Sequence, residues 1–142
     1  MTISTSIFLI LAIISWGAGA FFDKLTLRYI HHDTAFFGRT FGMMLIFIPL
    51  LSLRLSATYR ELSLASKYSW LYLFLSVVVT MSGVYFYLRA MSLSEASRVV
   101  PLSSTYPFVT LLLAVMFLGE SFTINKLVGT LLITAGIYFI SR

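Results

Sequence analysis

Long runs of apolar residues make up most of the chain, and short polar segments separate them. A helix rises about 1.5 Å per residue, so it needs ~20 apolar residues to cross a bilayer core about 30 Å thick. The runs are continuous and lack the alternation of apolar and polar positions that is typical of membrane-barrel strands. They predict five membrane-spanning helices, at about residues 3–22, 34–53, 69–88, 99–118 and 124–141.

Five helices of this length leave little of the chain outside the membrane. They use roughly 100 residues, which leaves about 40 of the 142 for the two termini and four short loops. We therefore predict an all-α integral membrane fold, with five transmembrane helices in one domain over residues 1–142. The first window contains Ala18-Gly19-Ala20, which has the form of a signal-peptide cleavage site. Because residues 1–6 contain no Lys or Arg, a retained helix is the favoured interpretation.

The composition indicates a lipid environment and excludes most soluble enzymes. Hydrophobic residues make up 59% of the chain and charged residues 11%, whereas a soluble domain has ~45–50% and ~25%. The chain has no cysteine, which excludes disulfides and thiolate metal sites. Its two histidines, His31 and His32, are adjacent, and adjacent side chains on a helix point in different directions. No nucleophile with a base and no phosphate-binding glycine loop is apparent, so we expect no catalytic residue, no metal and no cofactor.

Positive charge flanks the predicted helices and does not form a patch. The net charge is +5, but the ten Lys and Arg residues are scattered between apolar runs, so we expect the lipid bilayer, and not nucleic acid, as the partner. Four flanking charges lie on the side of the N-terminus and five on the opposite side: Arg54, Arg60, Lys67 and Lys126, against Lys24, Arg28, Arg89, Arg98 and Arg142. This near-even split is compatible with an orientation set by a few key charges and with insertion in both orientations.

Arg39 is the one full charge well inside an apolar window. Insertion scales put the cost of an arginine at mid-bilayer at ~2.5–3.5 kcal/mol, so a functional role is one interpretation. The other is that the long side chain reaches the nearby membrane surface. A functional Arg39 is expected to attract an anionic group or to pair with a helix C-terminus. Gly38 and Gly42 flank it in a G-x-x-x-G pattern, which allows close helix packing within the chain or between two chains.

The fourth window contains two prolines, Pro101 and Pro107, on either side of the polar stretch 103–106. An interior proline removes a helix hydrogen bond and frees a carbonyl, so we expect a bend that faces the bundle interior or a cavity. The hydroxyl groups of this stretch either line a substrate pocket or satisfy the freed backbone groups. Our candidates for the wall of a substrate cavity are Trp16, Arg39, Ser103 and Tyr106.

Several short motifs, in order along nearly the whole chain, resemble the EamA domains of the drug/metabolite transporter superfamily. They are Trp16-Gly17 with Phe21-x-x-Lys24 in the first helix, Tyr87-x-x-Ala90 in the third, Val99-x-Pro101-Leu102 with Tyr106-Pro107 in the fourth, and Leu118-Gly119-Glu120 followed by Gly129 and Gly136. The resemblance implies a five-helix EamA-like unit, which normally occurs twice in tandem with the two halves inverted. It also implies that Glu120, at the membrane edge, contacts helix ends or the loop and does not bind substrate.

The chain departs from the usual form of that family because it has a single unit. Five crossings place its termini on opposite sides, so pairing two chains in opposite orientations would restore the inverted symmetry. The chain also lacks the membrane-embedded acid in the first helix that is typical of the small multidrug-resistance branch, which argues against cation/proton antiport. Its carboxylates all lie at span ends or in loops: Asp23, Asp33, Glu61, Glu95 and Glu120.

We therefore expect a half-size membrane transporter for small metabolites or amphipathic solutes, working by alternating access as an antiparallel homodimer. Its expected location is the cell membrane or inner membrane of a prokaryote. The residues expected to bend or pack the helices are Pro101, Pro107, Gly38, Gly42, Gly129 and Gly136. The alternatives are a heterodimer with a second five-helix chain and a non-transporting subunit that stabilises or regulates a partner.

Overall fold

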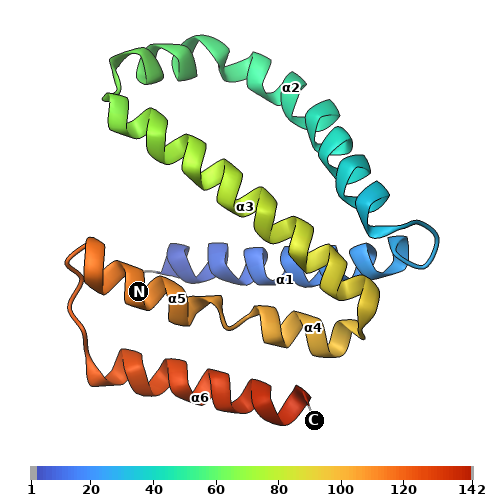
Figure 1. Cartoon of the computed structure of the whole chain (residues 1–142). Coiled ribbons are helices and arrows are strands. Elements are labelled where there is room, and N and C mark those ends of the chain that lie inside the picture. Colours follow the sequence, from blue (N-terminus) through green and yellow to red (C-terminus); the bar gives the residue numbers. More distant parts are fainter. Residues whose placement is uncertain (1–2, 142) are drawn as a thin grey trace. The chain divides into compact units, whose positions relative to one another are not determined.

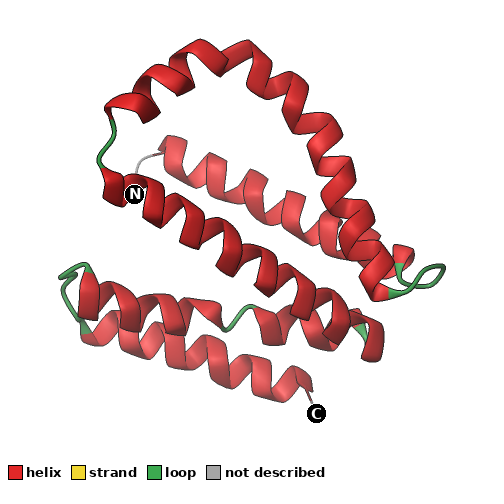
Figure 2. Cartoon of the chain, turned by 45° about the horizontal axis from the view of Figure 1, so that its top comes forward, coloured by secondary structure: helices red, strands yellow, loops and turns green. Residues whose placement is uncertain are grey.

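The computed structural model describes residues 3–141, and every regular element in them is an α-helix. The helices are α1 (Ile3–Thr26), α2 (His32–Leu64), α3 (Lys67–Leu93), α4 (Ala96–Ser103), α5 (Tyr106–Phe117) and α6 (Ile124–Ser141) (Figure 1, Figure 2). The prediction of an all-α fold is therefore confirmed. Arg142, which the charge count above includes, and the outermost ends of the predicted domain lie outside the described residues.

The helices have the length and composition of a membrane-spanning chain. Four stretches of the described residues are long and apolar enough to cross a bilayer: Ser4–Thr26, His32–Leu64, Lys67–Leu93 and Ala96–Phe117. The last of them combines α4 and α5. α6 is apolar but shorter, and its 18 residues are about 27 Å long, close to the thickness of a hydrocarbon core. Each of the five predicted windows overlaps one of these segments.

α2 is longer than the apolar window that predicts it. It has 33 residues and is about 50 Å long, whereas the window covers residues 34–53. Pro49 lies inside α2 and has no N–H to donate to the preceding turn, and the helix is curved (Figure 1). The part beyond the window carries Arg54 and Arg60, which suit the membrane surface better than the hydrocarbon core.

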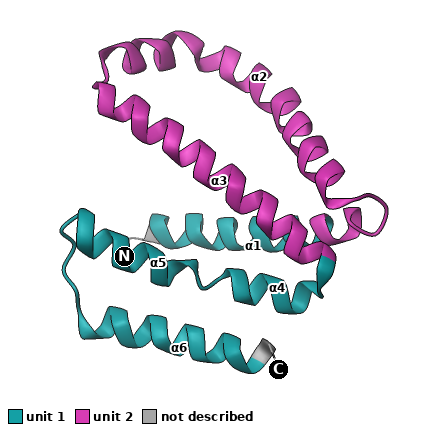
Figure 3. Cartoon of the chain, in the orientation of Figure 1, with its two compact units in different colours: residues 1–22, 93–142 teal, residues 23–92 magenta. Residues whose placement is uncertain are grey.

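The chain divides into two compact units (Figure 3). One unit comprises Met1–Phe22 and Leu93–Arg142, and in it α6 packs against α4 and α5. The other unit, Asp23–Ser92, contains the end of α1, all of α2 and nearly all of α3. The buried apolar residues are Val99, Ala114 and Ile137 in the first unit and Ala35, Leu88 and Met91 in the second.

Large apolar side chains are exposed along all the long helices. Phe8 in α1, Val79 in α3 and Phe139 in α6 are 71%, 67% and 77% exposed, respectively. An apolar surface of this extent is not compatible with water as the surrounding solvent. Helices satisfy their own backbone hydrogen bonds, so they can present such a surface to lipid.

Candidate functional site

Arg39 forms an ion pair with a carboxylate from the preceding helix. Its Nη1 atom lies 2.5 Å from Oδ2 of Asp23, which belongs to the last turn of α1. The Asp23 side chain is 18% exposed and that of Arg39 41%. Arg39 therefore lies about two turns inside α2 without being an unpaired charge. The sequence analysis missed this partner; the signal for it is the pair of opposite charges on the two sides of one short turn.

Lys24, the next residue after Asp23, binds the end of a third helix. Its Nζ atom donates a hydrogen bond to the carbonyl oxygen of Met91, at 2.7 Å. Met91 is fully buried and lies in the last turn of α3, where carbonyl groups have no partner within the helix. A lysine at this position satisfies one of these carbonyls and also interacts favourably with the negative end of the helix dipole.

Tyr87 of α3 completes this group of polar residues. It lies close enough to Asp23 and Arg39 for the charges of both to act on its hydroxyl group. We call Asp23, Lys24, Arg39 and Tyr87 the polar junction. Two of its members, Lys24 and Tyr87, belong to motifs that carry the family resemblance, and the fold brings these distant motifs together within one unit.

An aromatic contact joins the first turns of α2 to α3 in the same unit. The ring of Phe36 meets that of Tyr85 edge-on, with centroids 5.5 Å apart. The imidazole of His32 lies 6.1 Å from the same tyrosine ring. Edge-to-face pairs of this kind stabilise packing by about 0.5–1.5 kcal/mol beyond the area they bury. They hold the start of α2 in place relative to α3.

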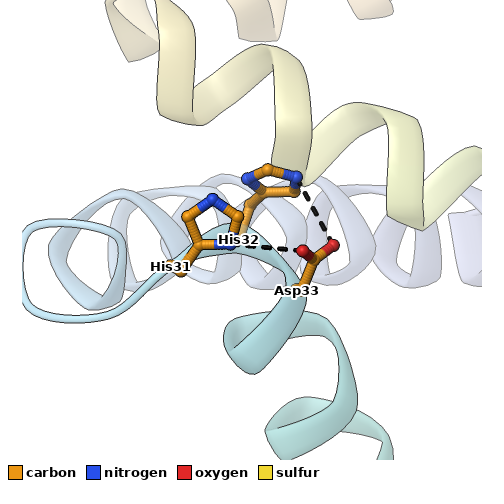
Figure 4. Close-up of side chains that lie close together, drawn as sticks. All are labelled: His31, His32 and Asp33. Atoms are coloured by element: carbon orange, nitrogen blue, oxygen red, sulfur yellow. Dashed lines mark ion pairs between the residues drawn. The ribbon is translucent and has the colours of Figure 1, made fainter.

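His31, His32 and Asp33 form a second polar cluster, at the start of α2 (Figure 4). The expectation that the two adjacent imidazoles point in different directions is wrong, because their ring centroids are 4.0 Å apart. His31 is the N-cap of α2 and has an extended backbone (φ −67°, ψ 152°), so helical side-chain directions do not apply to it. Its Nδ1 atom lies 3.2 Å from Oδ2 of Asp33, and Nε2 of His32 lies 3.4 Å from Oδ1.

The segment that contains two prolines is broken between α4 and α5. The hydroxyl groups of Ser103 and Ser104 both donate to the carbonyl of Val100, at 2.8 and 2.9 Å. The hydroxyl of Thr105 donates to the carbonyl of Leu102, at 2.8 Å. The Val100 carbonyl also accepts the N–H of Ser104, at 3.1 Å, and the Leu102 carbonyl that of Thr105, at 3.2 Å, so the hydroxyl groups add a further hydrogen bond to each carbonyl at the end of α4. The hydroxyl protons therefore satisfy the backbone, while the oxygen of Ser103 can still accept a hydrogen bond from a ligand.

The residues predicted to line one cavity are divided between the two units. Trp16, Ser103 and Tyr106 belong to one unit, in which the two aromatic side chains are 68% and 60% exposed. Arg39 belongs to the other unit, as a member of the polar junction. A cavity shared by all four residues therefore stays a prediction.

The glycines face open space within the described chain. A Cβ atom built on Gly38, Gly42, Gly129 or Gly136 would have no heavy atom of another element within 4 Å. Within its own unit, none of these glycines is therefore in close contact with another helix. The role of these glycines in close packing stays a prediction.

The Leu118-Gly119-Glu120 motif ends α5. Gly119 has a φ of +66°, a left-handed conformation that glycine adopts at little cost. This turn directs the N–H of Glu120 towards the carbonyl of Ala114, at 3.3 Å. The Glu120 carboxylate accepts a hydrogen bond from Nζ of Lys126, at 3.2 Å. Glu120 therefore makes the kind of loop contact expected for it.

Comparison with known proteins relates the chain to one protein family and to two individual proteins. The EamA-like transporter family matches residues 3–142. Uncharacterized protein MJ1333.1 of Methanocaldococcus jannaschii is 29% identical over 132 residues, which cover 93% of this chain and 92% of that protein. A protein of Sinorhizobium sp. described as an uncharacterized transporter in the cobO 3'region is 28% identical over 117 residues, 82% of each chain. No solved structure matches the chain.

Proposed function

The chain belongs to the EamA-like transporter family and is a multi-pass membrane protein, and from this premise we propose that it is a half-size secondary carrier for small metabolites or amphipathic solutes. The observation that carries the proposal is the family match over residues 3–142, together with helices of membrane-spanning length. The relative from Sinorhizobium sp. is itself described as a transporter. The proposed activity is transport alone, without a catalysed reaction or a cofactor, in the cell or inner membrane of a prokaryote.

We further propose that two copies work as an antiparallel dimer, each copy contributing one five-helix domain. The support is the odd number of predicted spans, which puts the termini on opposite sides and makes opposed copies symmetric. The near-even distribution of flanking positive charge gives neither orientation an advantage. The open faces at Gly129 and Gly136 of α6 allow the backbone of a second chain to approach closely. Substrate would then lie near the midplane, between two units that rock against each other.

The polar junction supports a role for Arg39 in binding the charged end of the solute. A guanidinium group has five N–H donors, and the contact with Asp23 is made through Nη1. An anionic group that binds the other donors competes with the Asp23 carboxylate for the same positive charge. Loading of the site therefore loosens the contact between the end of α1 and α2. This couples substrate binding to a movement of helices.

Trp16, Ser103 and Tyr106 are the proposed apolar and hydrogen-bonding part of the same cavity. Trp16 and Tyr106 are exposed aromatic side chains, which suit the flat apolar part of an amphipathic solute. Ser103 lies where the helix is broken, so it presents its oxygen next to backbone that is no longer in regular helical pairing. Irregular backbone at membrane depth is tolerated where it lines a cavity.

The test is a flux screen with a panel of metabolites in sealed proteoliposomes that contain only this chain. Arg39→Ala should reduce the flux of an anionic solute at least tenfold, since a charge-assisted hydrogen bond is worth about 1.5–3 kcal/mol. Ser103→Ala should reduce the flux of solutes with a donor group by a smaller factor. Arg54→Lys, on the same helix but outside the junction, keeps the flanking positive charge; it is the control and should leave the flux unchanged.

Two outcomes would contradict the proposal. Unchanged flux in both Arg39→Ala and Ser103→Ala would remove these residues from the pathway. Absence of any flux with a folded protein would instead support a non-transporting subunit or one half of a heterodimer. Co-reconstitution with a second five-helix chain would restore flux if the chain is one half of a heterodimer.

A further inference from the structure

We propose that His31, His32 and Asp33 bind one divalent transition-metal ion of the Zn²⁺ class. One ligand atom from each of the three side chains lies within 4.8 Å of the other two. Figure 4 shows the two imidazoles and the carboxylate converging at the start of α2. The three residues are consecutive, so the arrangement depends only on the local conformation of the chain at the N-cap.

The distances within the cluster fit coordination better than direct hydrogen bonding. Zn²⁺ binds imidazole nitrogen and carboxylate oxygen at about 2.0–2.2 Å, so two ligand atoms on a tetrahedron lie about 3.3–3.5 Å apart. Nδ1 of His31 lies 3.2 Å from Oδ2 of Asp33 and Nε2 of His32 lies 3.4 Å from Oδ1, so each imidazole nitrogen is already at such a separation from one of the two carboxylate oxygens. A hydrogen bond between an imidazolium and a carboxylate would be shorter, about 2.7–2.9 Å. The three ligand atoms, which lie within 4.8 Å of one another, have to draw together only slightly to admit the ion.

The donor set selects the class of metal. Neutral imidazole suits Zn²⁺, Cu²⁺, Ni²⁺ and Fe²⁺, whereas Mg²⁺ and Ca²⁺ prefer oxygen ligands alone. Asp33 supplies one negative charge, which offsets part of the charge of the ion. The N-terminus of α2 opposes a cation, but at an exposed position this effect is small beside three coordinate bonds. Three protein ligands leave a fourth position for water, as in exchangeable sites.

The surroundings make the cluster both accessible and ordered. The side chain of His31 is 67% exposed and that of Asp33 49%, so an ion can enter from the solvent side of the loop. The side chain of His32 is only 15% exposed, and its ring packs near Tyr85 of α3. This contact fixes the orientation of one ligand before the ion binds. It also connects the site to the α2–α3 contact made by Phe36 and Tyr85.

The experiment is titration of the full chain, purified without a histidine tag in detergent, with Co²⁺ and then with Zn²⁺. The two histidines of the chain are both in this cluster and the chain has no cysteine, so its sequence offers no other imidazole or thiolate ligand for a metal. We expect one Co²⁺ per chain with the visible absorption bands of a tetrahedral complex, displaced by Zn²⁺ but not by excess Mg²⁺. Bound Cu²⁺ should show hyperfine coupling to two nitrogens in its electron paramagnetic resonance spectrum.

The informative variants are His31→Gln and Asp33→Asn, because both side chains are exposed and their loss should not unfold the protein. Each should weaken Co²⁺ binding at least tenfold, since even loss of a group that only supports a ligand costs about 10–100-fold. Glu120→Gln, an exposed carboxylate in another loop, is the matched control and should bind Co²⁺ as the parent does.

The proposal is overturned by absence of saturable Co²⁺ or Zn²⁺ binding, or by unchanged binding in both variants with the helical circular dichroism signal intact. Binding that Mg²⁺ displaces equally well would also contradict it, because a site made of imidazoles does not prefer Mg²⁺. None of these readouts depends on transport, so the result is independent of the proposed function.

Discussion

The Oδ2 atom of Asp23 lies 2.5 Å from Nη1 of Arg39, and this contact joins the last turn of α1 to the early part of α2. A charge that would be costly in the membrane is thus neutralised by a side chain of the same unit. The neighbouring Lys24 binds the end of α3 at the same time. Two successive residues of α1 therefore connect it to two other helices, and this explains why the end of α1 carries charges of both signs.

The ion pair should contribute measurably to stability. Asp23→Asn leaves Arg39 without its carboxylate partner and should lower the free energy of unfolding in detergent by about 1–2 kcal/mol. This value is at the lower end of the range for removal of one partner of an ion pair, because the Arg39 side chain is 41% exposed and water screens its charge. Glu95→Gln, which breaks an exposed pair with Arg98 at 3.5 Å, is the control and should cost less than about 0.5 kcal/mol.

A double-mutant cycle gives the stricter test of the same pair. Asp23→Asn combined with Arg39→Gln should destabilise the protein less than the sum of the two single changes, with a coupling of about 0.5–3 kcal/mol. Strict additivity, measured by chemical or thermal unfolding, would show that the two charges do not interact in the folded protein.

Lys24 should hold the last turn of α3. Lys24→Met keeps most of the apolar stem and removes the hydrogen bond to the Met91 carbonyl, which should cost about 1 kcal/mol. Hydrogen exchange should then become faster in the last turn of α3 and remain unchanged in α6. Lys126→Met, which removes an exposed loop pair with Glu120, is the comparison. Equal effects of the two substitutions on α3 would contradict a capping role for Lys24.

Gly129 and Gly136 should matter for the association of two chains and not for the fold of one. A larger side chain at either position has room within the described chain, so Gly136→Leu should leave helical content and thermal stability of the monomer unchanged. If a second chain packs on this face, the same substitution should reduce crosslinked dimer in proteoliposomes several-fold. Gly83→Leu in α3 is the matched control, because a Cβ atom built on Gly83 also has no heavy atom of another element within 4 Å. Dimer yields that are the same for both variants would exclude the α6 face as the interface.

Orientation in the membrane separates the antiparallel dimer from its alternatives. Tags at both termini should each be accessible from both sides of the membrane in about equal proportion, because the flanking charges are nearly balanced. Adding two lysines to the loop between α3 and α4, on the side that already has five flanking charges against four, should bias the population to one orientation and reduce flux in parallel. A single orientation for all molecules of the parent chain would show that an antiparallel homodimer does not form.

Most of the fold follows from the sequence because membrane-spanning helices are a local property. A helix satisfies its own backbone groups, so a run of about 20 apolar residues is sufficient to predict one, and no distant residue has to be known. For this reason the apolar windows overlap the observed helices. Pro101 and Pro107 likewise predict a bend in the fourth span, because proline changes backbone hydrogen bonding wherever it stands, and the structure has a break into α4 and α5 there.

The polar contacts could not be predicted in this way, because they depend on which residues meet across turns and between helices. From the sequence, Asp23 is at a span end and Arg39 has no identified partner, because only the path of the turn between them decides that they meet. It also assumed helical geometry for His31, and the extended backbone at the N-cap brings the imidazoles together instead. Local hydrogen bonding and hydrophobicity thus determine where the helices are, whereas the pairing of charges is a property of their three-dimensional arrangement.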